Sequence, residues 1–178
     1  TIMIKIYDGL FDKRFTSDLA SRLIHSPWYA GNVANRYSWP YRETGTHRLL
    51  GQNYFLNGKT YPHINEKKLT ETLINAFEPI QRACKKKMEL LEVGTNLQFK
   101  GMNGSIHTDG HDNQYSFILM LCNEEVENIG GEFIHNKKKI SFKHGRLIQI
   151  KASDPHRALS FNKPHIARLS VKWVGKFK

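Results

Sequence analysis

The sequence is poor in cysteine, because Cys84 and Cys122 are its only two and cannot form a disulfide framework. It has no apolar run long enough to span a membrane and no apolar stretch of the signal-peptide type near its N-terminus. Internal repeats and low-complexity segments are also missing, and the ordinary hydrophobic content argues against disorder. These absences predict a single globular domain without a membrane contact, with both cysteines as buried thiols in a reducing, cytoplasmic setting.

Acidic residues are scarce as well, since 16 Asp and Glu stand against 27 Lys and Arg, for a formal net charge of +11. Such an excess favours acidic partners or nucleic acid. The lysines are scattered, however, and the short runs 85–87, expected on a helix, and 137–139, expected in a hairpin turn, contain no interleaved aromatic residues for base stacking. A solubilising surface explains the charge equally well, so nucleic acid is a possible but not a favoured partner. The oligomeric state is left open.

The first 95 residues predict helices and irregular segments. A short strand is expected within 3–7, followed by a helix that Thr16, Ser17 or Asp18 caps and that runs to about residue 24. A second helix is expected from 66 to about 77, capped by Asn65, and a third piece from Pro79 to about residue 91.

Residues 28–63 are rich in Trp, Tyr, Gly, Asn and Pro, which predicts irregular structure with a strand or two, one of them at 49–55. Trp39 and Tyr41 within this range could line a substrate opening, although covering the core is the more frequent role of such residues.

Beyond Gly94 the pattern changes to short strands separated by turn residues. They are expected at 97–99, 105–107, 116–121, 132–135, 139–142, 147–150, 158–161 and 166–174. Closely spaced strands of this kind predict a jelly-roll double sheet. We therefore expect a mainly β protein with N-terminal helices, in which 1–178 form one domain with a helical and irregular prelude at 1–95 and a β core at 96–175.

The chemistry is expected around Gly104–Gly110, where His107 and Asp109 stand two residues apart. Residues i and i+2 of an extended segment point to the same side, so the imidazole and the carboxylate can face one point in space. They would form two-thirds of a 2-His-1-carboxylate triad, the usual open site for non-haem Fe(II). Most such tripeptides are solvated loop residues, so the pair needs a third ligand to be meaningful.

His156 is the best third ligand among the remaining histidines, because it follows Asp154-Pro155 and opens a new strand. The intervening chain is long enough for several strands and can return beside the first pair. His111 is too close to Asp109 and lies in a polar loop. We expect the others to be surface residues: His25, His47, His63, His135, His144 and His165.

Arg168 is the candidate for binding an anion. In the strand that contains it, alternation places Arg168, Ser170 and Lys172 on one face. An arginine directed into the barrel is costly without an anion, and its planar fork suits a carboxylate bound by two hydrogen bonds, with Ser170 able to add a third. For Arg168 alone, a strand whose polar face is exposed to solvent is the simpler interpretation.

Taken together and in order, these motifs resemble the Fe(II)/2-oxoglutarate-dependent oxygenases, and most closely the small prolyl-hydroxylase-like members. The motifs are His107-x-Asp109, Gly130-Gly131-Glu132-Phe133, Gly145-Arg146-Leu147-Ile148, His156 and Arg168-x-Ser170. The passage from Leu121-Cys122-Asn123 to the double glycine also fits that group. The resemblance covers roughly residues 97–173.

The resemblance implies a double-stranded β-helix of the cupin-like type. His107, Asp109 and His156 would bind Fe(II), and Arg168, helped by Ser170, would bind the far carboxylate of 2-oxoglutarate. Dioxygen would be the oxidant, 2-oxoglutarate would be decarboxylated to succinate, and ascorbate is an optional further cofactor. The implied activity is hydroxylation, with a prolyl residue in a peptide or protein as the preferred substrate.

The sequence departs from the group at three places. Leu121 stands where the oxygen-sensing prolyl hydroxylases of animals have a tyrosine, and a second tyrosine is missing near Gln98, whose amide could supply a hydrogen bond to 2-oxoglutarate instead. Val174 stands where nucleic-acid dealkylating members carry an additional arginine. The alternatives that stay open are a dioxygenase acting on nucleic acid or on a free amino acid, a metal-binding jelly-roll module without turnover, and a basic interaction domain.

Overall fold

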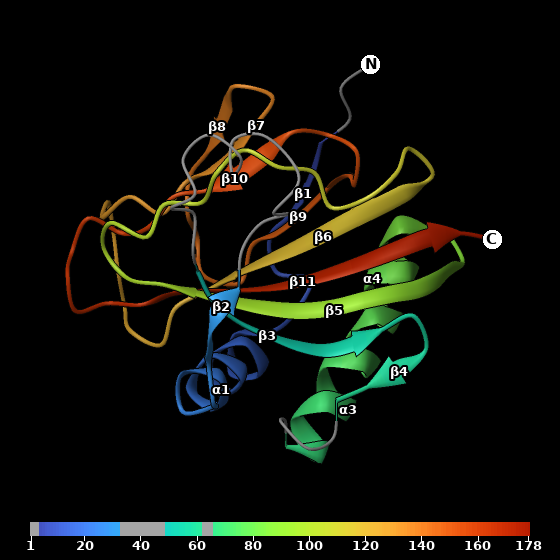
Figure 1. Ribbon diagram of the computed structural model, residues 1–178, viewed down its shortest axis with the longest axis horizontal. Coiled ribbons are helices and arrows are strands. Elements are labelled where there is room, and N and C mark those ends of the chain that lie inside the picture. The colour runs from blue at the N-terminus through green and yellow to red at the C-terminus, as the bar shows by residue number, and fades with distance from the viewer. Residues whose placement is uncertain (1–3, 33–48, 62–65) are drawn as a thin grey trace.

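The computed structural model describes residues 4–32, 49–61 and 66–178 of the chain. These residues form two antiparallel sheets that face each other, with the helices packed on the outer side of the larger sheet (Figure 1). The architecture is mainly β with N-terminal helices, as the strand spacing predicts, and it is the double-stranded β-helix. Residues Trp39, Tyr41, His47, His63 and Asn65, for which the sequence makes predictions, lie outside the described part.

The larger sheet has the strand order β1-β9-β6-β11-β5-β3-β2, with β4 paired to β3. Its strands are β1 (Lys5–Tyr7), β2 (Tyr29–Asn32), β3 (Leu49–Leu56), β4 (Lys59–Thr60), β5 (Met88–Gln98), β6 (Gln114–Leu121), β9 (Leu147–Lys151) and β11 (Arg168–Phe177). The C-terminal strand β11 is therefore central, paired with β6 on one side and β5 on the other.

The outer face of this sheet carries the main core. Alternation along β11 directs Leu169, Val171 and Trp173 toward the helices, and all three are fully buried. The covering elements are α1 (Lys13–Ile24), α3 (Lys67–Asn75) and α4 (Phe77–Cys84). The Trp173 indole N–H donates to the Leu73 carbonyl of α3 at 2.7 Å, so burial of this large ring leaves no unsatisfied donor.

The smaller sheet has the order β10-β7-β8 and lies on the opposite side of the larger sheet from the helices (Figure 1). Its strands are β7 (Phe133–His135), β8 (Lys138–Ile140) and β10 (His156–Ala158). Asn136 and Lys137, both with positive φ, form the turn between β7 and β8, as expected for the lysine run. Between the sheets, Ile118, Met120, Phe133, Ile140, Ile148 and Ile150 form a second apolar cluster.

Three predictions of local structure between residues 85 and 107 are wrong. The range from 88 to 91 is not helical, because it pairs with the end of β11 and becomes the start of β5; cross-strand packing overrides the helix-compatible composition here. The lysines at 85–87 accordingly follow α4, with Lys85 as its left-handed C-cap. Residues 105–107 form no strand, only an isolated bridge at His107.

Helix α1 begins earlier than predicted, because Asp12 caps it and accepts a hydrogen bond from the Phe15 N–H at 2.7 Å. Thr16, one of the expected caps, is instead inside the helix and buried. Both cysteines are free, with Cys122 buried and Cys84 partly buried. None of the helices in the described ranges is long and apolar enough to cross a membrane.

Candidate metal centre

His107 and His156 are brought together by the backbone. They form an antiparallel bridge in which the His107 N–H donates to the His156 carbonyl and the His156 N–H donates to the His107 carbonyl, each at 3.0 Å. Directly opposed residues of a bridge project to the same side, and the two ring centroids are 4.5 Å apart. Two histidines distant in sequence are thus fixed side by side.

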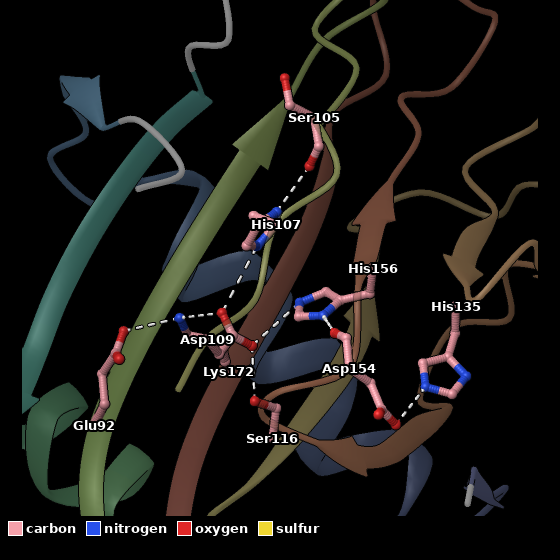
Figure 2. Close-up of polar contacts among 9 residues, drawn as sticks. All are labelled: Glu92, Ser105, His107, Asp109, Ser116, His135, Asp154, His156 and Lys172. Carbon is pink, nitrogen blue, oxygen red and sulfur yellow. Dashed lines mark hydrogen bonds and ion pairs between the residues drawn. The ribbon is translucent and has the colours of Figure 1, made fainter. Parts of the chain in front are cut away.

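Each imidazole is held in one tautomer by a backbone carbonyl two residues before it. His107 Nδ1 lies 2.8 Å from the Ser105 carbonyl, and His156 Nδ1 lies 2.8 Å from the Asp154 carbonyl (Figure 2). A carbonyl only accepts, so Nδ1 carries the proton on both rings. On both rings Nε2 is then the nitrogen without the proton, and it faces the Asp109 carboxylate, the arrangement that metal-ligating histidines use.

The Asp109 carboxylate completes the cluster. The Asp109 N–H donates to the Ala152 carbonyl at 2.8 Å, which fixes the backbone beside the larger sheet. Its Oδ1 lies 3.7 Å from His107 Nε2, its Oδ2 lies 3.2 Å from His156 Nε2, and its side chain is only 2% exposed. The Ser116 hydroxyl donates to Oδ2 at 2.7 Å and orients the carboxylate.

The three ligand atoms suit a metal ion. One nitrogen of each imidazole and one oxygen of Asp109 all lie within 4.8 Å of one another. Ligands about 2.1 Å from a common ion at right angles stand about 3.0 Å apart, so the two shorter separations require little adjustment. Two neutral imidazoles and one carboxylate form the donor set of an open non-haem iron site, and the sequence predicted these three residues as its ligands.

Lys172 is a close neighbour that the sequence analysis placed on the correct face without giving it a role. From β11 its ammonium donates to Asp109 Oδ1 at 2.9 Å and forms an ion pair with Glu92 of β5 at 3.0 Å (Figure 2). Burial by itself would raise the pKa of Asp109, but the adjacent ammonium holds that pKa well below its usual range. Burial likewise would lower the pKa of Lys172, yet the two carboxylates raise it.

The metal-free protein is expected to lose stability on acidification because of His107. Burial, with His156 beside it, lowers the pKa of His107 to about 4, from 6.5 in a solvated histidine. Between these two values the unfolded state binds more protons than the folded state, so the free energy of unfolding should fall as the pH falls from 6.5 to about 4. Asp109 adds a loss of the same sign at still lower pH.

This pH dependence can be measured by urea denaturation in chelator at a series of pH values. His107→Gln removes the titrating group and should flatten the profile between the two pKa values. His165→Gln, at an exposed histidine, is the control and should leave the slope unchanged. Equal slopes for the wild type and His107→Gln would contradict the assignment.

Arg168 lies at the start of β11 on the same inner face as Lys172, and it is fully buried. Its Nε donates to the Gly131 carbonyl at 2.9 Å and its Nη1 donates to Gln98 Oε1 at 3.2 Å. Its Nη2 is buried without a partner among the described residues. Burial lowers the pKa of Arg168 to about 10. A buried cation with an unused, fixed N–H group is what a carboxylate ligand would satisfy.

The double glycine of the sequence motif supports this arginine. Gly131 has a φ of +81° and a side chain there would meet the Phe161 ring at 2.4 Å, so only glycine fits. Its carbonyl is thereby placed to accept from Arg168 Nε. The double glycine is thus explained by the need to place the Gly131 carbonyl as an acceptor for Arg168.

Gln98 and Ser170 both lie near Arg168, on the inner face. The Gln98 amide accepts from Arg168, and its two N–H groups are used by the carbonyls of Met102 at 2.8 Å and Ala158 at 3.1 Å. This bonding gives Gln98 the task of orienting the guanidinium. Ser170 is buried two residues beyond Arg168 on the same side of β11.

Two histidines expected on the surface are inside the protein. His135 is fully buried, and its Nε2 lies 2.9 Å from the carboxylate of Asp154, the residue whose carbonyl orients His156 (Figure 2). His144 is half-buried and links the Cys122 N–H to the Thr16 hydroxyl at 3.1 Å each. The strand register explains why His135 is buried, because it places His135 opposite His156 in the smaller sheet.

Comparison of the sequence with models of known families and with curated proteins finds no match. Solved structures match the fold. An oxidoreductase of the 2OG-Fe(II) oxygenase family from Burkholderia pseudomallei has a TM-score of 0.72 at 12% identity, over 97% of this chain and 84% of that one. A prolyl hydroxylase in complex with a hypoxia inducible factor peptide fragment, from Trichoplax adhaerens, has a TM-score of 0.68 at 11% identity, over 99% and 84%.

A third similar structure is HygX from Streptomyces hygroscopicus with nickel, 2-oxoglutarate and hygromycin B bound, with a TM-score of 0.66 at 9% identity, over 99% of this chain and 83% of that one. At these identities the likeness shows the fold. The chain therefore shares the double-stranded β-helix with proteins of the 2OG-Fe(II) oxygenase family.

Proposed function

We propose that the protein is an Fe(II)- and 2-oxoglutarate-dependent dioxygenase that hydroxylates a prolyl residue in a peptide or protein. The observation that carries the reaction class is the convergence of two Nε2 atoms on the oxygens of Asp109, on rings whose Nδ1 atoms both donate to backbone carbonyls. Among the solved structures with a similar fold, one is an oxidoreductase of this family. Another, HygX, was solved with nickel and 2-oxoglutarate bound.

The roles of this chain's residues follow from their contacts. His107, Asp109 and His156 would hold the iron, and Arg168 would use its unpartnered Nη2 to bind the far carboxylate of 2-oxoglutarate, with Ser170 beside it and Gln98 orienting the guanidinium. When bound, iron and 2-oxoglutarate supply the oxidising chemistry, in which dioxygen is consumed, succinate is formed and the substrate gains one oxygen atom. Burial of the His156 and Asp109 side chains would limit the access of bulk water to the reaction.

The prolyl substrate is supported by the motif order and by a fold neighbour that is a prolyl hydroxylase with a peptide bound. The formal net charge of +11 predicts that an acidic peptide would be attracted more strongly than a basic one. Val174, standing where the dealkylating members have an arginine, argues against a nucleic-acid substrate.

The test is a panel of proline-containing peptides with acidic or basic residues flanking the proline, incubated with Fe(II) and 2-oxoglutarate in air. We expect succinate formation and a gain of one oxygen atom by at least one peptide, the acidic ones first. Arg168→Ala serves as the inactive control. No oxidation of any peptide, with or without succinate formation, would overturn the prolyl substrate. Failure of the Mn(II)-loaded protein to bind 2-oxoglutarate would overturn the reaction class.

A further inference from the structure

The environment of Asp109 contains a cationic group, the ammonium of Lys172, at hydrogen-bond distance from the carboxylate. Both carboxylate oxygens already have partners, because Lys172 donates to Oδ1 at 2.9 Å and Ser116 donates to Oδ2 at 2.7 Å. A hydroxyl can remain beside a metal-bound carboxylate at little cost. An ammonium at hydrogen-bond distance from a ligand oxygen instead repels an incoming dication strongly, since the site is buried.

The same ammonium has a second carboxylate within reach. Glu92 Oε1 lies 3.0 Å from Lys172 Nζ, and the two side chains come from neighbouring strands, β5 and β11. Lys172 stands opposite Gly94, and Glu92 is two residues away on the same face, so no side chain separates them. Lys172 can therefore leave Asp109 without becoming an unpaired, partly buried cation, which would be the costly outcome.

We propose that Lys172 is an exchangeable internal counter-ion of the metal centre, which neutralises Asp109 in the metal-free protein and moves onto Glu92 when a divalent cation binds. This inference rests on the proposed metal site. Lys172 and Glu92 then act as positioning residues that set the metal affinity from outside the ligand set. Lys172 lowers the metal affinity because its ammonium repels the cation. Glu92 raises the metal affinity because its carboxylate accepts the ammonium that the cation displaces.

The test is calorimetric titration with Mn(II) under anoxic conditions, without substrate or turnover. Lys172→Met removes the competitor and should tighten Mn(II) binding by about tenfold or more. Glu92→Gln removes the alternative partner while keeping shape, fixes Lys172 on Asp109, and should weaken binding by about tenfold. The matched controls are Lys176→Met and Glu89→Gln, an exposed cross-strand pair on the same two strands, which should leave affinity unchanged.

The double variant distinguishes transfer of Lys172 from Asp109 to Glu92 from independent electrostatic effects of the two side chains on the metal. If Glu92 acts by receiving Lys172, Glu92→Gln should have little effect once Lys172 is methionine, whereas independent fields would give additive changes. Unchanged or weaker Mn(II) binding by Lys172→Met, or additive effects in the double variant, would overturn the inference. Circular dichroism checks that each variant is folded, and Glu92→Gln keeps the test informative if Lys172→Met is not. Failure of the wild type to bind Mn(II) would instead overturn the proposed metal site.

Discussion

His156→Ala is expected to abolish stoichiometric binding of Fe(II) or Mn(II), with a loss of affinity of more than about 100-fold, since even partners outside the ligand set are worth 10- to 100-fold. The expectation rests on the position of His156, whose Nε2 lies 3.2 Å from Asp109 Oδ2 while Nδ1 is engaged by the Asp154 carbonyl. Removing it leaves one imidazole and one carboxylate, too few ligands for an open site of this type.

The measurement is metal content after anoxic loading and desalting, together with calorimetry. His165→Ala, at an exposed histidine in a turn, is the matched control and should retain a full equivalent of metal. Urea denaturation without metal checks that His156→Ala is folded. A full equivalent of metal in folded His156→Ala would exclude this residue as a ligand and with it the proposed centre.

Arg168→Ala is expected to weaken binding of 2-oxoglutarate to the Mn(II)-loaded protein by roughly 30-fold to a few thousand-fold, since losing one partner of a buried, charge-assisted pair costs about 2–5 kcal/mol. Arg168→Lys should weaken binding too, because an ammonium cannot occupy the positions of Nε, Nη1 and Nη2 together, of which two already bind Gly131 and Gln98. Calorimetry under anoxic conditions gives both affinities.

A ligand lacking the far carboxylate provides the control. The wild type should bind 2-oxoglutarate far more tightly than 2-oxobutyrate, and Arg168→Ala should lose most of this preference, which ties the effect to the carboxylate and not to general damage. Arg82→Ala, at an exposed helix position, should behave as the wild type. An undiminished preference for 2-oxoglutarate in Arg168→Ala would place the carboxylate elsewhere.

The three residues of the candidate metal centre can be predicted from local features of the sequence. The His107-x-Asp109 spacing and the position of His156 after a turn predict a cluster that the structure brings together. Alternation along 168–174 correctly separates Arg168 and Lys172 from the apolar residues beneath the helices. The prediction for β11 succeeds because a strand has a period of two, and side-chain direction follows from it without knowledge of the neighbours.

The groups around the centre could not be found in the same way, because they depend on pairing between distant strands. Glu92 directly follows the range that the sequence assigns to helix, which ends at about residue 91, and it reaches Lys172 only because β5 pairs with β11. His135 was expected at a hairpin surface, yet register places it opposite His156 and buries it. The pairing register between strands that are distant in sequence depends on the whole sheet and cannot be deduced from a local sequence pattern.

The bridge between His107 and His156 has a consequence for how this protein tolerates mutation. The spacing of the two imidazoles is fixed by N–H and carbonyl groups that every residue except proline possesses in full. Exchanges at the flanking residues Ile106 and Arg157 therefore leave that spacing intact, with proline as the exception wherever a donor is needed. The side chains beside the bridge can therefore change in the course of evolution while the two imidazoles keep their mutual position.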